Sequence, residues 1–284
     1  MFLASIKKAV RRVRRQNNEN FLRHAAGQVD GFLVSYPKSG RTWLRFALSC
    51  YFAKKHKLDF EPDLRSTFKV HPNFDRSPER GLNAFVGRSA DSSLPLIAVS
   101  HRSYDEKLFG RRPVIFLVRD PRDVLVSAYF HETRHKHRFD GSIAEFLEND
   151  DYGLPAIIRY LNGWAAGLAN HDALIISYED MSADAAAQIR RILEFMGQPV
   201  DEAALDAAIE ASRFDRMRRD EQKNGIPGHE YDRDDSESLR VRKGKVGGFD
   251  EYLGADDVER LMELCRTGLS PEARALITHT TLKL

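Results

Sequence analysis

The feature that most constrains this chain is an apolar run at residues 32–34 that passes directly into a tight turn and then into a helical pattern. The run consists of strand formers, and Pro37 ends it because proline cannot donate a hydrogen bond to a neighbouring strand. Gly40 permits the turn, and the apolar spacing is helical from Thr42 onward. A helix N-terminus that faces such a turn presents unpaired N–H groups and the positive end of the helix dipole, which together favour a phosphate group. Lys38 adds a positive charge at the same place.

This turn differs from the common nucleoside-triphosphate loop, in which the lysine follows the second glycine of G-x-x-x-x-G-K-[ST]. Here the order is Lys38-Ser39-Gly40, so the lysine comes before the glycine. We interpret the turn as a P-loop-like anion site of another kind. The alternative is an ordinary strand–turn–helix unit in which the lysine has no ligand.

Three further apolar runs, at residues 96–100, 114–118 and 173–177, alternate with helical patterns. This alternation predicts a three-layer α/β fold with a central parallel sheet flanked by helices. Ligands of such sheets bind at the carboxyl ends of the strands. His101 directly follows the second run, so we expect it at the same edge as Lys38, either as a catalytic group or as a hydrogen-bonded structural residue.

Two other segments are suited to binding anions. Arg119 follows the third run, and Ser127 lies eight residues later on the expected helix. The segment 242–244, Arg-Lys-Gly, combines positive charge with a backbone that can approach a phosphate closely. Between the expected helices and this segment, the charged residues 218–241 predict a mobile loop that can act as a lid. The alternative for Arg119 is an ion pair with a neighbouring aspartate.

A different chemistry is suggested by His131-Glu132-x-x-His135, which has the spacing of the zinc peptidase motif. The extended form of that motif is not completed, because residue 138 is not glycine and residue 141 is not histidine. We therefore expect no metal here and interpret His135-Lys136-His137-Arg138 as a solvated, basic end of a helix.

The chain has 284 residues, two cysteines and a formal net charge of +2. This length allows one large domain with a sizeable core, and two distant cysteines fit a reducing compartment. We expect a basic amphipathic helix over residues 1–24 and a single domain over residues 25–284. No apolar run approaches a membrane span, although residues 1–16 leave open a peripheral contact with a membrane. We expect no nucleic-acid partner, and the sequence does not indicate the oligomeric state.

Taken in order, the motifs between about residues 32 and 253 resemble those of the cytosolic-type sulfotransferases, which use 3′-phosphoadenosine 5′-phosphosulfate (PAPS). The matching motifs are Tyr36-Pro37-Lys38-Ser39-Gly40-x-Thr42-Trp43, Arg119-x8-Ser127, Tyr178-Glu179-Asp180-Met181, Phe214-x-x-Met217 and Arg242-Lys243-Gly244-x-x-Gly247.

The resemblance implies transfer of a sulfuryl group from PAPS to a hydroxyl, or less readily an amine, of a small-molecule acceptor in the cytoplasm, without a metal. His101 would be the general base, and Lys38 would stabilise the leaving group. The donor would be held by three sets of residues: Lys38, Ser39, Gly40, Arg41, Thr42 and Trp43 at the 5′-phosphosulfate; Arg119, Ser127, Arg242, Lys243 and Gly244 at the 3′-phosphate; and Tyr178, Ser212 and Phe214 at the adenine. The alternatives are a phosphoryl-transfer enzyme or nucleotide kinase of similar fold, the zinc peptidase, and a nucleotide-binding module without catalysis.

The chain departs from the family pattern at two places that bear on these roles. Val99 stands where the family usually has a second catalytic lysine, and Arg41 replaces a common threonine in the turn. The sequence names no particular acceptor.

Overall fold

The four strands of this computed structural model form one parallel sheet in the order β2-β1-β3-β4. The structure describes residues 13, 16–87, 92–227 and 231–284. The strands are β1 (Gly31–Ser35), β2 (Ile97–Ser100), β3 (Val114–Val118) and β4 (Ala173–Ser177). Val34 pairs with Ser100 and Ser35 pairs with Leu117, so the carboxyl ends of β2, β1 and β3 lie at the same level. The predicted parallel α/β sheet is confirmed.

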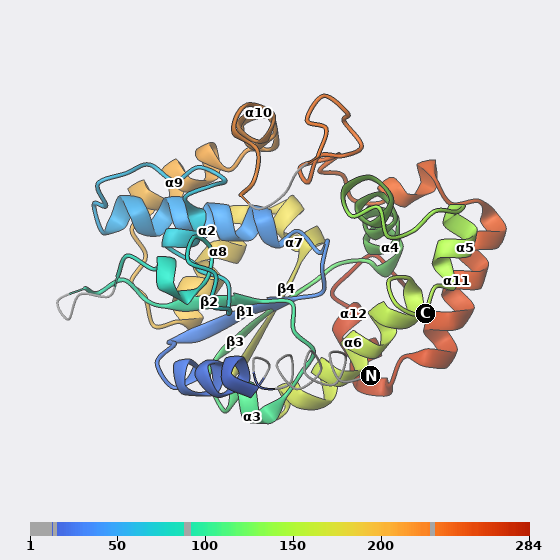
Figure 1. Ribbon diagram of the computed structural model, residues 1–284, viewed down its shortest axis with the longest axis horizontal. Coiled ribbons are helices and arrows are strands. Elements are labelled where there is room, and N and C mark those ends of the chain that lie inside the picture. The colour runs from blue at the N-terminus through green and yellow to red at the C-terminus, as the bar shows by residue number, and fades with distance from the viewer. Residues whose placement is uncertain (1–12, 14–15, 88–91, 228–230) are drawn as a thin grey trace, which may run out of the picture.

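Helices cover both faces of the sheet (Figure 1). The side chains of β1 alternate between two cores, with Phe32 and Val34 in one and Leu33 in the other. The second core is covered by α2 (Arg41–Lys55), α8 (Ala185–Phe195) and α9 (Glu202–Ala211); the first is covered by α4 (Pro121–Phe130), α6 (Leu154–Leu168), α11 (Ala255–Gly268) and α12 (Pro271–Ile277).

The shorter elements connect these layers. They are the helices α3 (Glu106–Phe109), α5 (Ile143–Leu147) and α7 (Tyr178–Ala183), the 3₁₀ turns Thr67–Lys69, Leu82–Ala84 and Gly248–Glu251, and the π-helical turn His131–His135. Asp120 caps α4 by accepting a hydrogen bond from the N–H of Arg122, with Pro121 at the first helical position, as expected for a helix start.

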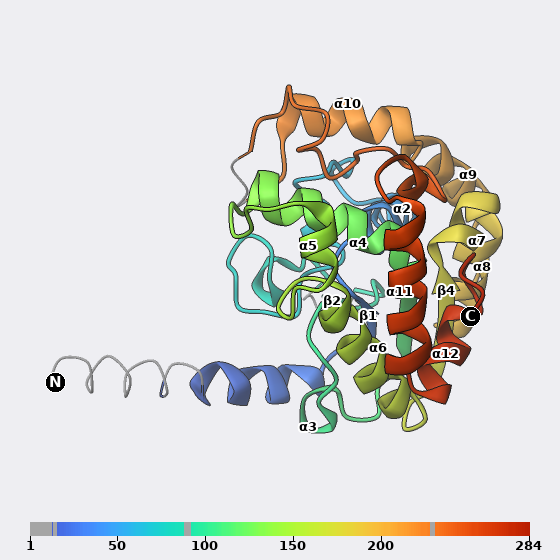
Figure 2. The same cartoon turned by 90° about the vertical axis from the view of Figure 1, so that its right-hand side faces the viewer.

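Helix α10 (Phe214–Asn224) lies at one end of the molecule, next to the chain that leads into α11 (Figure 2). The prediction that residues 218–241 form one loop is therefore wrong in its first part, because the helix extends to Asn224. The charged sequence did not indicate a helix here, because few residues of α10 are buried. Its buried residues are Met217 and the acidic Glu221.

The basic helix expected over residues 1–24 is described only in part, because residues 1–12 and 14–15 lie outside the described residues. Residues 16–26 are helical, and Leu22, Ala25 and Ala26 pack into the first core. The membrane contact expected for residues 1–16 falls largely outside the described part. No helix among the described residues is long and apolar enough to cross a membrane.

Candidate active site

The turn between β1 and α2 has the backbone of an anion site. Gly40 is the N-cap of α2 with φ of 96°, and among the described residues no side chain caps this helix. The first N–H groups of α2 are therefore open toward the turn. Lys38 also has a positive φ of 74°, and Ser39 is buried. Thr42 and Trp43 lie in the first turn of α2, as predicted.

Gly40 is required here because Tyr178 leaves no room for a side chain. A Cβ atom at Gly40 would lie 2.4 Å from Cδ2 of Tyr178. Tyr178 follows β4, is 7% exposed, and contacts the ring of Trp43 edge-on at 5.6 Å. The two aromatic residues predicted from separate motifs therefore lie together beside the turn.

The environment of Lys38 is partly buried and positive. Burial, followed by the charge of Arg240, lowers the pKa of Lys38 to about 7, while the carboxylate of Glu221 opposes this shift. Arg242 and Arg119 contribute further positive charge. Burial and neighbouring positive charges make the protonated form of Lys38 unfavourable. An anion that binds beside Lys38 would therefore stabilise that form strongly.

His101 lies at the end of β2, where its ring is held by the neighbouring strand. Its Nδ1 lies 2.7 Å from the carbonyl oxygen of Ser35. A carbonyl oxygen can only accept, so Nδ1 carries the proton and Nε2 has the lone pair. Burial and the charge of Arg41 hold the pKa of His101 well below its usual value. At neutral pH the ring is therefore uncharged and Nε2 can accept a proton.

Arg119, at the end of β3, connects the turn to the glycine-rich segment. Its guanidinium stacks over the Tyr178 ring at 4.1 Å, and it donates to the carbonyl oxygens of Lys38 at 3.4 Å and Lys245 at 3.1 Å. It also pairs with Asp123 at 3.3 Å. The ion pair considered as the alternative is therefore present, and Arg119 also reaches the turn. Ser127 lies two turns along α4 and is partly buried.

Asp123, which the motifs did not single out, fixes the glycine-rich segment. It is 3% exposed, and its carboxylate accepts from the N–H groups of Gly247 at 2.9 Å and Phe249 at 3.0 Å. The same carboxylate pairs with Arg119. The buried carboxylate of Asp123 thus holds the glycine-rich segment beside α4. No local pattern in the sequence indicates this contact.

We expect Asp123→Ala to lower the free energy of unfolding by roughly 2–4 kcal/mol, since it leaves buried donors and one arginine without their acceptor. Urea denaturation measures the change. Asp206→Ala on the exposed side of α9 is the matched control, and it should change stability by less than about 0.5 kcal/mol. Equal stability of the two variants would contradict the role of Asp123.

The two charged side chains of segment 242–244 are each paired with an acidic residue outside the segment. Arg242 donates to Glu237 at 2.9 Å and to the Tyr252 hydroxyl at 3.0 Å, and Lys243 pairs with Glu251. An anion that binds here has to compete with these carboxylates.

The two remaining residues predicted at the adenine are placed differently. Phe214 at the start of α10 is 38% exposed, and a Cβ at Gly244 would lie 2.2 Å from its Cδ2, so the two are adjacent. Ser212 is 2% exposed, and its hydroxyl donates to the carbonyl of Ile209 within its own helix at 3.3 Å.

Arg240 is the second residue that the sequence did not indicate. Its charge lowers the pKa of Lys38, Arg41 and His101, so it acts electrostatically on the predicted catalytic residues. Glu221, which is fully buried, accepts from the N–H groups of Arg240 and Val241, both at 2.7 Å. Helix α10 thereby positions the chain just before segment 242–244. The only signal in the sequence was the proximity of Arg240 to that segment.

Two side chains of the His131-Glu132-x-x-His135 motif, those of Glu132 and His135, are bonded to other parts of the chain. Glu132 is bonded to Arg138 at 2.7 and 2.8 Å, and Nε2 of His135 contacts the carbonyl of Ser238. Within the described residues, no three His, Cys, Asp or Glu side chains lie close enough to hold a metal ion. The expected solvated helix end is wrong for His135, which is buried.

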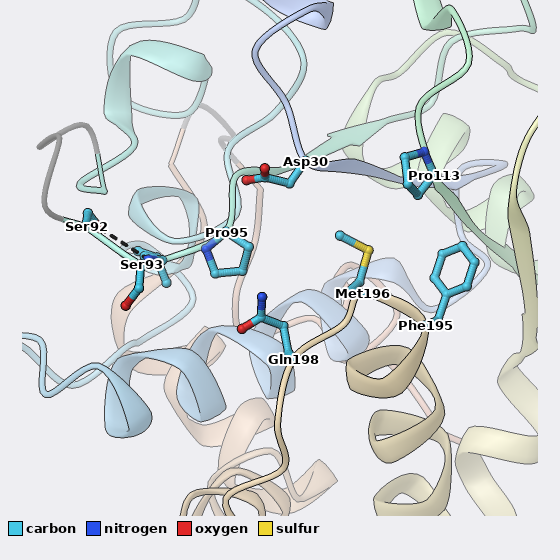
Figure 3. Close-up of a pocket in the computed structure, with 9 residues that line it drawn as sticks. Asp30, Ser92, Ser93, Pro95, Pro113, Phe195, Met196 and Gln198 are labelled. Carbon is cyan, nitrogen blue, oxygen red and sulfur yellow. Dashed lines mark hydrogen bonds between the residues drawn. The ribbon is translucent and has the colours of Figure 1, made fainter.

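A cavity of about 380 Å³ lies at the opposite edge of the sheet (Figure 3). It is lined by Asp30 and Pro113, which precede β1 and β3, and by Phe195, Met196 and Gln198 after α8, together with residues 92–95. Among the described residues that line this cavity, none is a lysine or an arginine.

Comparison with known proteins identifies the family of this chain. The family described as "Sulfotransferase domain" matches residues 28–276. Sulfotransferase 2B1 of Mus musculus is 30% identical over 79% of this chain and 66% of its own length. Cytosolic sulfotransferase 17 of Arabidopsis thaliana is 28% identical over 82% of this chain and 72% of its own length.

Solved structures share the fold. Mouse sulfotransferase SULT7A1 complexed with PAP has a TM-score of 0.62 at 21% identity, covering 92% of this chain and 94% of its own. Retinol dehydratase in complex with androsterone and the inactive cofactor PAP has a TM-score of 0.62 at 18% identity, covering 90% of this chain and 82% of its own.

Proposed function

Since this chain belongs to the sulfotransferase family, we propose that it transfers the sulfuryl group of PAPS to a hydroxyl, or less readily an amine, of a small molecule. The observation that carries this proposal is the meeting of three groups at one sheet edge. The uncapped start of α2 follows β1, His101 follows β2, and Arg119 follows β3. Two structures of similar fold contain PAP, which is the desulfated product of PAPS.

In this proposal the donor lies across β1 toward β3. The N–H groups of the turn, together with Lys38 and Thr42, bind the 5′-phosphosulfate, and the ring of Trp43 lies against the adenine with Tyr178 and Phe214. Arg119, Ser127 and segment 242–244 bind the 3′-phosphate. Ser212 supports the adenine site through the end of α9, since its own hydroxyl is bonded within that helix.

The chemistry follows from the positions of His101 and Lys38. Nε2 of His101 removes the proton of the acceptor hydroxyl, and the acceptor oxygen forms a bond to sulfur as the bond to the bridging phosphate oxygen breaks. Lys38 neutralises the charge that develops on that bridging oxygen. Positioning and charge stabilisation account for most of the rate in such a transfer, so no metal is needed in this proposal.

The lowered pKa of Lys38 gives the proposal a pH signature. In the free protein the pKa of Lys38 is about 7, and the phosphates of PAP favour the charged form and raise this pKa. Above pH 7 binding therefore takes up a proton at Lys38, and the affinity falls by up to about tenfold per pH unit. Calorimetry at pH 8 in two buffers of different ionisation enthalpy should give an uptake that approaches one proton.

Lys38→Arg is the matched variant, because arginine stays protonated at pH 8 in both states. Its proton uptake should be close to zero. The same uptake in the variant as in the wild type would assign the proton to another group and contradict the role of Lys38.

The direct test is release of PAP from PAPS in EDTA, with mixed phenols, alcohols and amines as acceptors. Turnover that depends on both acceptor and Arg119 supports the function, and no acceptor-dependent release contradicts it. We also propose that residues 25–284 act as one domain, and that the protein works in the cytoplasm, as the name of its Arabidopsis relative suggests.

A further inference from the structure

Two arginines on one face of α2 have no acidic partner in the described structure. Arg41 opens the helix and Arg45 lies one turn further on, so both project to the same side. Arg45 is only 4% exposed; its Nη2 donates to the neutral amide oxygen of Asn73 at 2.6 Å, and its Nε has no partner. Within the described residues, no hydrogen bond or ion pair engages the Arg41 side chain.

An unpaired buried cation is unusual, because removing its charge from water is costly unless an anion compensates it. Arg41 is partly buried, and the acid whose charge acts on it is Asp75, without an ion pair between them. The Oδ1 atom of Asp75 accepts from the N–H of Ser77 instead. Burial and the charge of Arg240 accordingly lower the pKa of Arg41 to about 9, which still leaves it charged at neutral pH.

These arginines lie on the acceptor side of the site. The anchors proposed for the donor extend from β1 toward β3, where Arg119 lies. Arg45 reaches in the other direction, to Asn73, and the N–H of the next residue, Phe74, donates to the carbonyl of Val99 in β2 at 2.8 Å. Arg41 and Arg45 are also the side chains whose charges most lower the pKa of His101. The unpaired charge thus acts on the proposed base.

A buried hydroxyl completes this cluster. Tyr160 on α6 is 5% exposed, and within the described part of the chain its hydroxyl meets no hydrogen-bond partner. The charge of Arg41 acts on this hydroxyl, and the Tyr160 ring contacts that of Tyr36 in the turn at 5.3 Å. The nearby indole N–H of Trp164 donates at 2.9 Å to the carbonyl of Arg102, directly after the base, which places α6 beside it.

We propose that the acceptor carries an acidic group in addition to the hydroxyl that is sulfated, and that Arg41, supported by Arg45 and Tyr160, binds this group. The acidic group is a carboxylate, a sulfate or a phosphate, each of which a guanidinium can bind through two hydrogen bonds. This inference rests on the proposed function, and it names the class of acceptor.

The experiment titrates the PAP-saturated protein with four phenols of the same ring. They are 4-hydroxybenzoate, 4-hydroxybenzenesulfonate, 4-hydroxyphenyl phosphate and, as the neutral reference, methyl 4-hydroxybenzoate. Calorimetry or ligand-observed NMR at constant ionic strength gives each affinity. Arg41→Gln is the test variant, and Arg260→Gln, at an exposed ion pair with Glu148, is the control.

We expect at least one acidic phenol to bind the wild type and the control about tenfold or more tightly than the ester, and Arg41→Gln to abolish this preference. The strongest of the three acids identifies the acidic group. PAP affinity is measured for each variant as well, and the phenol titrations use PAP concentrations that saturate that variant, because Arg41 belongs to the turn that binds the donor.

Three results would overturn the inference: binding of the ester as tight as that of every acid, a preference that survives Arg41→Gln, and no binding of any phenol to the PAP-loaded protein. A loss of PAP affinity in Arg41→Gln with the preference unchanged would assign Arg41 to the donor and overturn it as well. Failure of PAP itself to bind the wild type would instead contradict the proposed function.

Discussion

His101→Ala is expected to lower kcat by about 10²–10⁴-fold, the usual contribution of a general base. Its Kd for PAP should change little, because in the proposed mechanism Nε2 of His101 acts on the acceptor, and Nδ1 is bonded to the carbonyl of Ser35. The pKa of His101 is held well below its usual value, so the wild type should keep its full rate down to a pH below the ordinary histidine pKa of about 6.5. Steady-state rates between pH 5 and 8, with calorimetry of PAP, measure both effects.

The matched control is His24→Ala, at an exposed residue of the N-terminal helix, which should keep both turnover and PAP affinity. Turnover of His101→Ala equal to that of the wild type would remove His101 as the base. A parallel loss of turnover and PAP affinity would show that His101 maintains the site and does not act in the chemical step.

Gly40→Ala is the second large effect, because the added methyl group has no room. The residue has φ of 96°, which costs a non-glycine residue about 1–2 kcal/mol. The new Cβ would also lie 2.4 Å from Tyr178, and Tyr178 cannot move freely because Arg119 stacks on its ring at 4.1 Å. We expect the turn to shift and PAP affinity to fall by about a hundredfold or more. The reason is that several backbone N–H groups of the turn would then no longer point toward the bound phosphate.

Gly197→Ala is the control that separates the cost of a positive φ from the cost of the steric clash. Gly197 has φ of +63° and nothing within 4 Å of its added Cβ, so this variant carries the backbone cost without the clash. It should lose about 1 kcal/mol of stability and keep its PAP affinity. If Gly40→Ala also keeps its PAP affinity, the turn is not the donor site.

The parts that local sequence could predict are the strands and the turn. Residues 114–118 and 173–177 form strands with the predicted bounds, because uninterrupted β-branched and apolar runs leave few alternatives. Lys38, His101 and Arg119 reach one edge because strand order in a parallel sheet brings the carboxyl ends together.

Contacts between distant segments could not be predicted in this way. Asp123 bonds residues more than a hundred positions away, and Glu221 accepts from the N–H groups of Arg240 and Val241, which lie 19 and 20 positions further along the chain. A buried acid of this kind has no spacing signature, and within a charged stretch it cannot be distinguished from a solvated one. The unpaired state of Arg41 and Arg45 likewise emerges only when the surrounding side chains are placed.

The most direct test of the account is calorimetric titration with PAP, and separately with ATP, in EDTA and in magnesium. We predict tight PAP binding that is the same with and without metal, and a loss of about ten- to a hundredfold in Arg119→Ala. Arg190→Ala, which removes a surface ion pair with Glu202, should bind PAP like the wild type. Binding of magnesium–ATP without binding of PAP would contradict the sulfotransferase site and favour phosphoryl transfer.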